Sequence, residues 1–252
     1  MKQRLFAVLV ASVAMLSVNM AAAAGKVNVA VASNFTAPMK MIAAEFERDT
    51  GHQALLSFGA TGQFYAQIKN GAPFDVLFSA DAKTPRKLEQ EGLAVSGTQR
   101  TYARGRLVLW SKDPALVDDG PAILKSDRFE KIALANPKLA PYGAAAIEVI
   151  ARLGLTQTLA SKVVQGSNIG QAFQFVASGN AQLGFVALSQ VFAAGRFKEG
   201  SGWIVPEDYY ATIEQDVVLL KSGQDNPAAH ALLAYLRTER VQEVLQSFGY
   251  QP

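Results

Sequence analysis

Apolar residues in the first third of the chain alternate between two kinds of spacing. The run at 27–32 is typical of a β-strand, and the segment at 36–50 places Met39, Ile42 and Phe46 at helical spacing. The same order of strand and helix continues to residue 92, in the segments 53–58, 63–69, 75–80 and 84–90. This order predicts a parallel, doubly wound sheet.

Two longer β patterns, at 101–112 and 212–221, interrupt this alternation. Between them the pattern predicts further strands and helices at 132–135, 144–153, 163–164, 170–178 and 184–187. Two C-terminal helices follow at 227–236 and 241–248. The chain is therefore predicted to form two similar α/β lobes, with the C-terminal helices closing the first lobe.

The predicted lobes divide the chain at the two long β patterns. Residues 25–105 and 220–252 form lobe 1, and residues 106–219 form lobe 2. In such a fold, ligands bind at the carboxyl ends of the parallel strands, where the loops that lead into the helices gather.

The first 24 residues resemble an export signal. Lys2 and Arg4 precede an apolar stretch, and Ala21–Ala24 supplies the small residues of a cleavage site before Gly25. The alternative is an uncleaved membrane anchor, but Ser12, Ser17 and Asn19 interrupt the apolar stretch and no basic stop follows it. Residues 1–24 are therefore predicted to be a cleaved signal peptide, which leaves a soluble protein in the periplasm.

Composition narrows the possible functions. Removal of the signal takes away two positive charges and lowers the formal charge from +3 to +1, so nothing in the charge favours nucleic-acid binding. The chain contains no cysteine, which excludes disulfides and a lipid anchor on a cleavage-site cysteine. Stability must then come from the apolar core, and half of the residues are apolar.

Four predicted strands run into small polar residues that precede a helix. These junctions lie at 31–34, 58–62, 140–143 and 166–169, and none contains an Arg or a Lys. Each would present unpaired backbone N–H groups and a hydroxyl or an amide at the positive end of a helix dipole. One such junction is usually only a helix cap. If the fold brings all four together, they form a ring of uncharged donors for a small anion.

Other chemistries lack the residues that they require. Gln63 stands where a P-loop would have its lysine. His52 and His230 are far apart in sequence and away from the four junctions, so we predict packing or surface roles for them, with no catalytic role and no zinc site. We therefore predict a binding protein without a cofactor, not an enzyme.

The chain resembles the periplasmic molybdate-binding proteins of bacterial ABC importers over nearly all of its mature length. The residues that carry the resemblance are Ala-Val-Ala-Ser-Asn-Phe at 30–35, Phe-Asp-Val-Leu-Phe-Ser-Ala-Asp at 74–81, Ala-Asn-Pro-Lys-Leu-Ala-Pro-Tyr-Gly at 135–143 and Ser-Gly-Asn-Ala-Gln-Leu-Gly-Phe-Val-Ala-Leu-Ser at 178–189. The third motif is the most specific. The resemblance implies a two-lobed periplasmic binding protein fold of type II, in which each lobe is a mostly parallel sheet flanked by helices.

The resemblance also implies the site. By position, Ser33 and Thr61 match the hydroxyl donors of the first lobe, with Asn34 beside them, while Tyr142 and Ile169 match second-lobe positions that offer backbone N–H groups. The implied ligand is molybdate, with tungstate also bound, and the implied partner is the membrane permease of an ABC importer. The protein is expected to be a monomer.

One position departs from the pattern. Some relatives place a tyrosine, whose hydroxyl reaches the anion, where this chain has Ala187, and Tyr142 is the natural substitute. Other functions stay open from the residues alone. The solute could be sulfate, an organic anion, or iron bound through Tyr209 and Tyr210. A hydrolase or a transferase could also use the same cleft.

Overall fold

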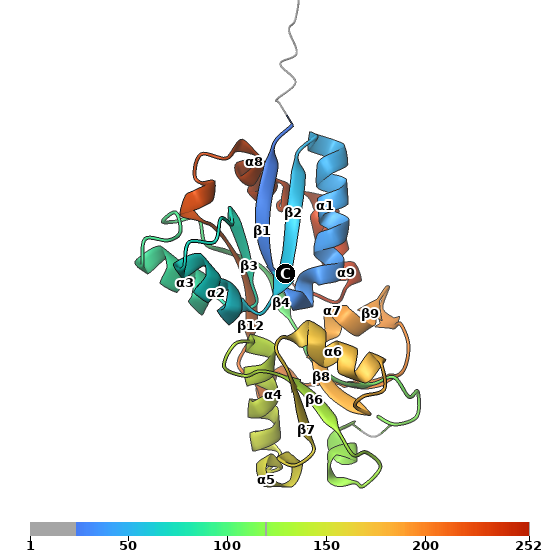
Figure 1. Cartoon of the computed structure of the whole chain (residues 1–252). Helices are drawn as coiled ribbons and strands as arrows, with labels where there is room; N and C mark the ends of the chain where they lie inside the picture. Colours follow the sequence, from blue (N-terminus) through green and yellow to red (C-terminus); the bar gives the residue numbers. More distant parts are fainter. Residues whose placement is uncertain (1–23, 119, 252) are drawn as a thin grey trace, which may run out of the picture.

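A computed structural model describes residues 24–118 and 120–251 of the chain. Figure 1 shows two lobes, each built on a sheet with helices packed against it. The signal peptide predicted at residues 1–24 lies, except for Ala24, outside the described residues. Among the described residues no helix combines the length and the apolar character needed to span a membrane.

Lobe 1 contains a five-stranded sheet in the order β2-β1-β3-β12-β4. Its strands are β1 (Lys26–Ala32), β2 (Gln53–Gly59), β3 (Val76–Ser79), β4 (Arg100–Gly105) and β12 (Ile213–Leu219). β1 pairs in parallel with β2 and β3, whereas β12 is antiparallel to both β3 and β4. Four of the five strands therefore run in one direction, as the sequence predicts.

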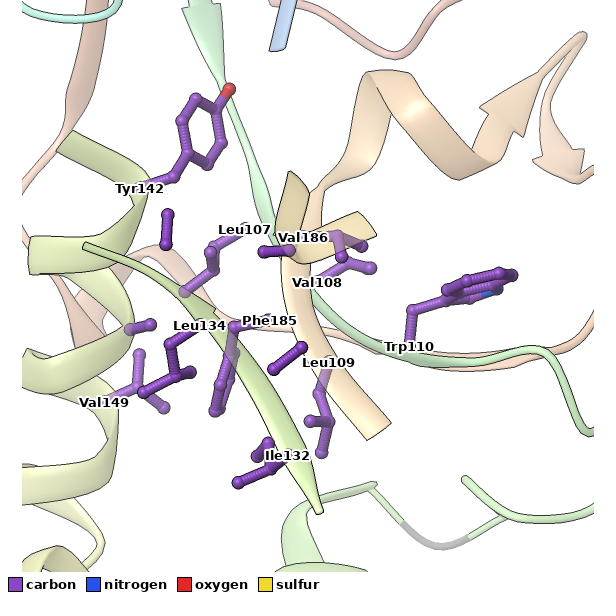
Figure 2. Close-up of a cluster of buried hydrophobic side chains, with 14 of the residues drawn as sticks. Leu107, Val108, Leu109, Trp110, Ile132, Leu134, Tyr142, Val149, Phe185 and Val186 are labelled. Atoms are coloured by element: carbon purple, nitrogen blue, oxygen red, sulfur yellow. The ribbon is translucent and has the colours of Figure 1, made fainter. Parts of the chain in front are cut away.

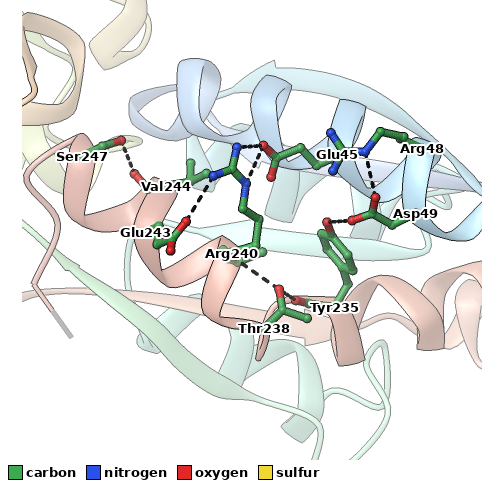
Figure 3. A network of polar contacts seen from close by, with 10 residues as sticks. Glu45, Arg48, Asp49, Tyr235, Thr238, Arg240, Glu243, Val244 and Ser247 are labelled. Atoms are coloured by element: carbon green, nitrogen blue, oxygen red, sulfur yellow. Dashed lines mark hydrogen bonds and ion pairs between the residues drawn. The ribbon is translucent and has the colours of Figure 1, made fainter.

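The helices of lobe 1 come from both ends of the chain. They are α1 (Thr36–Thr50), α2 (Thr61–Lys69), α3 (Lys83–Gln90), α8 (Pro227–Tyr235) and α9 (Glu239–Ser247). Figure 1 shows α8 and α9, in red, beside the blue N-terminal elements. Arg240 of α9 donates to Glu45 Oε1 of α1 over 2.6 and 2.9 Å, and Tyr235 donates to Asp49 over 2.6 Å (Figure 3).

Lobe 2 contains the other five-stranded sheet, in the order β11-β5-β8-β6-β7. Its strands are β5 (Leu107–Ser111), β6 (Ile132–Ala135), β7 (Val163–Gly166), β8 (Leu183–Ala187) and β11 (Ser201–Ile204). The short hairpin β9 (Phe192–Ala193) and β10 (Arg196–Phe197) lies apart from it. The helices are α4 (Pro141–Arg152), α5 (Thr156–Leu159), α6 (Ile169–Ala177) and α7 (Leu188–Val191).

The core of lobe 2 lies between this sheet and its helices. Leu107 and Leu109 of β5, Phe185 of β8 and Val149 of α4 are fully buried in one cluster (Figure 2). Burying one such side chain contributes about 1.5–3 kcal/mol, so the apolar runs that the sequence shows hold this lobe without disulfides. Lobe 1 has separate clusters on the two faces of its sheet.

The chain crosses between the lobes at two places among the described residues. The first crossing is at Arg106, between β4 and β5. The second lies between β11 and β12, ahead of Ile213, because β12 pairs within the sheet of lobe 1. The predicted boundary at 219/220 therefore falls at the end of a strand of lobe 1, and residues 213–219 belong with that lobe.

Candidate functional site

The ends of four strands meet where the two lobes face each other. Helix α2 begins directly after β2, α6 begins shortly after β7, α4 begins after the loop that follows β6, and a 3-10 turn at Ser33–Phe35 follows β1. Together they line a small cavity, which we call the donor cavity. Its lining is Ala32, Ser33, Asn34, Gly59, Ala60, Thr61, Ala80, Ala140, Pro141, Tyr142 and Ile169.

All five predicted site residues line the donor cavity. Ser33, Asn34 and Thr61 come from lobe 1, and Tyr142 and Ile169 come from lobe 2. Ser33 is 7% exposed and the other four are at most 3% exposed. No Arg, Lys, Asp or Glu of the described chain lines the cavity, so its polar character comes from neutral groups alone.

Thr61 offers a hydroxyl proton to the donor cavity. Its Oγ1 accepts a hydrogen bond from Ala80 N over 3.0 Å, which fixes the oxygen and leaves its proton available to donate. Thr61 is also the first residue of α2, where the backbone N–H groups have no partner within the helix. The hydroxyl and the backbone N–H of Thr61 and the helix dipole therefore favour a negative charge at the same place.

Ser33 lies between the two lobes. Its Oγ is 3.2 Å from Asn168 Oδ1 and accepts from Gly170 N over 3.2 Å, and both of these partners belong to the start of α6. Asn168 in turn caps α6 by accepting from Gln171 N. Ser33 thus contacts the second lobe at the N-terminal end of α6, the helix whose first residue is Ile169.

The lobe 2 donors are backbone N–H groups at helix starts. Pro141 occupies the first position of α4 and has no N–H, so Tyr142 carries the first donor of that helix. Ile169 is the first residue of α6. Because the first N–H groups of a helix have no partner in the helix, both can donate to a ligand in the cavity.

The side chains of Asn34 and Tyr142 are engaged with neighbours on lobe 1. Asn34 Nδ2 donates to Gln215 Oε1 and to Tyr250 Oη, each over 2.9 Å, and the Tyr142 hydroxyl lies 3.4 Å from Gln215 Nε2. Figure 2 shows the Tyr142 ring extending from α4 beyond the aliphatic cluster. The Tyr142 hydroxyl therefore contacts β12. This position gives no support to the prediction that the hydroxyl replaces the tyrosine that some relatives have where this chain has Ala187.

Gln215 and Tyr250 were not predicted from the sequence. Both are buried, and burial raises the pKa of the Tyr250 hydroxyl to about 12 and that of the Tyr142 hydroxyl well above its ordinary value. Gln215 gave only a weak signal, because it lies between Glu214 and Asp216 in the polar part of its strand. Tyr250 gave no comparable signal, because it lies after the last helix.

The lobes approach each other closely at the donor cavity. Gly62 N donates to Leu139 O over 2.9 Å, and a Cβ on Gly62 would come within 3.1 Å of the Leu139 backbone. A larger groove adjoins the cavity, but charged groups of both signs line it, among them Asp81, Lys83 and Glu148. The donor cavity is therefore the better match to the predicted ring of neutral donors.

The residues that the alternative functions would require lie outside the donor cavity. His52 accepts from Gly25 N over 3.0 Å, His230 contacts Gln224 O, and neither lines the donor cavity. Tyr210 accepts from Leu107 N, while the Tyr209 ring packs on Trp203. In the described part of the chain, no three His, Cys, Asp or Glu side chains gather as a metal site would need.

Residues 27–251 match the family model described as bacterial extracellular solute-binding protein. The chain therefore belongs to this family of binding proteins.

Two curated relatives share more than half of their residues with this chain. The molybdate-binding protein ModA of Azotobacter vinelandii is 58% identical over 230 residues, which cover 91% of each protein. The molybdate-binding protein ModA of Rhodobacter capsulatus is 54% identical over 229 residues, covering 91% of this chain and 89% of that protein. The solved periplasmic molybdate-binding protein of Azotobacter vinelandii matches with a TM-score of 0.86 and 40% identity, covering 90% of this chain and 99% of that one.

Proposed function

We propose that this protein captures molybdate between its two lobes in the periplasm and delivers it to the membrane permease of an ABC importer. The observation that carries the proposal is a buried cavity between the lobes whose lining holds hydroxyl and N–H donors and no ionisable side chain except Tyr142. Two relatives named for molybdate binding, at 58% and 54% identity, support this ligand.

Neutral donors suit a fully deprotonated dianion. Hydroxyls and N–H groups can each donate to one oxygen of the anion, and the ends of α2, α4 and α6 add favourable dipoles of up to about 1 kcal/mol each. Because the donors carry no charge, the lobes can separate and release the anion without leaving a buried cation unpaired. Tungstate has the same shape and charge as molybdate, so we include it among the ligands.

Sulfate and phosphate test different features of the donor cavity. Sulfate is also a dianion but smaller, and each hydrogen bond to a charge that is left unmade costs about 1.5–3 kcal/mol. Hydrogen phosphate carries a proton that requires an acceptor. Asn34 Oδ1 is buried and has no hydrogen-bond partner within the described residues, so phosphate binding tests whether this oxygen accepts that proton.

The experiment is a titration of the mature protein with molybdate, tungstate, sulfate and phosphate, followed by thermal unfolding. At a ligand concentration about 100 times Kd, molybdate and tungstate are expected to stabilise the protein by about 2.7 kcal/mol. Sulfate and phosphate at the same concentration are expected to leave the unfolding temperature nearly unchanged. Equal stabilisation by sulfate would remove the argument from size, and stabilisation by iron alone would favour the metal-binding alternative.

The proposed periplasmic location leads to a separate prediction about the N-terminus of the mature protein. Mass spectrometry of the exported protein should find Gly25 as its first residue, because cleavage after Ala24 is the expected processing. Retention of residues 1–24 on a membrane-bound protein would favour the anchor that the sequence leaves as the alternative.

A further inference from the structure

A group of buried, uncharged polar side chains lies on the far side of two donor-cavity residues. Its members are Asn34, Tyr142, Ser189, Gln215 and Tyr250, which we call the bridging network. Each of these residues is at most 5% exposed. The sequence motifs and the proposed function assign no role to Ser189, Gln215 or Tyr250.

The contacts of the bridging network centre on Asn34. Ser189 Oγ donates to Asn34 O over 2.8 Å, and the Tyr250 hydroxyl lies 3.1 Å from Ser189 Oγ and 3.2 Å from Asn34 O. The side-chain amide of Asn34 donates to both Tyr250 and Gln215. The backbone of Asn34, which borders the donor cavity, is thus held through its own carbonyl and its own side chain.

The bridging network joins the two lobes. Asn34, Gln215 and Tyr250 belong to lobe 1, whereas Ser189 is in α7 and Tyr142 is in α4 of lobe 2. Gln215 contacts Asn34 on one side and the Tyr142 hydroxyl on the other, so it connects donor-cavity residues of opposite lobes.

The network also borders the first crossing between the lobes. Leu188, the neighbour of Ser189, donates its N–H to Arg106 O at that crossing. A Cβ on Gly105 would overlap the Tyr142 hydroxyl, so the space for this hydroxyl exists only because residue 105 is a glycine. The Tyr142 hydroxyl therefore reaches Gln215 directly beside the first crossing between the lobes.

We infer that Ser189, Gln215 and Tyr250 are positioning residues for the captured anion. They hold Asn34 and Tyr142, and with them the facing donors of the two lobes, at the separation at which both can reach one tetrahedral dianion. This inference rests on the proposed function, because it concerns how the same cavity reaches its affinity. Uncharged groups that do not touch the anion would then favour the closed form of the protein.

The test compares two hydroxyl deletions in the network with two matched deletions outside it. Tyr250→Phe and Ser189→Ala remove hydroxyls of the bridging network. Tyr235→Phe removes a hydroxyl that binds Asp49 within lobe 1, and Ser111→Ala removes a buried hydroxyl that binds Gln182 O within lobe 2. Each protein is titrated with molybdate in a calorimeter, its rates are measured by stopped flow, and its unfolding temperature is measured without ligand.

Tyr250→Phe and Ser189→Ala are expected to raise the Kd for molybdate about 5- to 30-fold, mainly through faster dissociation. The two matched variants are expected to lose comparable thermal stability while Kd stays within about twofold of the parent. If all four variants keep the parental Kd, or if the matched variants lose as much affinity as the network variants, the inference is wrong. A parent protein that binds neither molybdate nor tungstate would instead refute the proposed function.

Discussion

At the residue scale, Thr61 is the donor whose geometry is most tightly defined. Its Oγ1 accepts from Ala80 N, so only its proton remains for the ligand. Thr61→Ala would remove the hydrogen bond that we propose between this hydroxyl and the anion, and a hydrogen bond to a charged group is worth about 1.5–3 kcal/mol. We expect the Kd for molybdate to rise about 10- to 100-fold, as measured by isothermal titration calorimetry.

The control for this variant is Thr98→Ala in the same lobe. Thr98 Oγ1 also accepts from a backbone N–H, that of Leu219, and donates to Val95 O, but it lies outside the donor cavity. Its loss should lower the unfolding temperature without changing Kd by more than about twofold. Comparable Kd values for the two variants would show that the anion is held somewhere else.

Residues near the ends of strands could be found from the sequence, whereas their supporting partners could not. Ser33, Thr61 and Ile169 lie shortly after predicted strands, and such positions gather at one edge of a parallel sheet. Gln215 and Tyr250 are 181 and 216 residues from Asn34 along the chain. No local pattern encodes a contact over that separation, so the role of Asn34 as a bridging residue appears only in the folded structure.

At the scale of single elements, the start of α2 decides how closely the lobes approach. Gly62 lies in the first turn of α2, and alanine at such a position favours the helix over glycine by up to about 1 kcal/mol. A Cβ at this position would press on the Leu139 backbone at 3.1 Å, across the contact between the lobes. Gly62→Ala is therefore expected to weaken molybdate binding severalfold while the unliganded protein keeps or gains stability.

Calorimetric titration and thermal unfolding of the same Gly62→Ala sample separate these two effects. The opposite outcome, lower stability with unchanged Kd, would mean that the lobes bind the anion without closing at Leu139.

The contact between α1 and α9 is expected to affect stability alone. Arg240 donates twice to Glu45 Oε1, and the Glu45 side chain is only 10% exposed (Figure 3). Arg240→Ala leaves this carboxylate nearly buried without its cation, so the unfolding temperature should fall by several degrees. Adding Glu45→Gln to the Arg240→Ala variant should restore part of the loss, because a neutral amide is cheaper to bury. Molybdate titration of both variants should give the parental Kd.

The assignment of elements to sheets was less predictable than the elements themselves. The β pattern at 212–221 is confirmed as β12, but its alternation does not say which of two neighbouring sheets it joins. Pairing with β3 and β4 places it in lobe 1. Apolar spacing determines which face of a strand is buried, while the partner strand depends on contacts between distant parts of the chain.

At the scale of the whole molecule, two lobes with separate cores meet at a cavity lined by neutral groups. Ala32, Ala60 and Ala80 of lobe 1 pack with the core cluster of lobe 2. Small side chains at these positions let the backbones of the strand ends come close to each other and to a ligand. The cavity therefore lacks charged side chains at the same place where the two lobes come into close contact.

Because several tyrosines are buried, the free energy of unfolding of the protein is expected to fall at alkaline pH. Burial raises the pKa of Tyr250 to about 12 and that of Tyr102 and Tyr142 well above 10. Between pH 10 and 12 the unfolded chain loses these protons while the folded protein keeps them. The folded state then binds more protons, so the free energy of unfolding is fully present below pH 10 and falls as the pH rises above it.

The expected fall is about 1.4 kcal/mol per pH unit for each tyrosine that stays protonated in the folded state. Urea unfolding from pH 8 to pH 11 measures it directly, because the midpoint should stay level up to about pH 9.5 and then decline. Tyr250→Phe removes one of the titrating hydroxyls, so its decline above pH 10 should be shallower than that of the parent protein. A midpoint that stays level to pH 11 would show that these hydroxyls are not buried, and the bridging network would lose its basis along with the closed arrangement of the lobes.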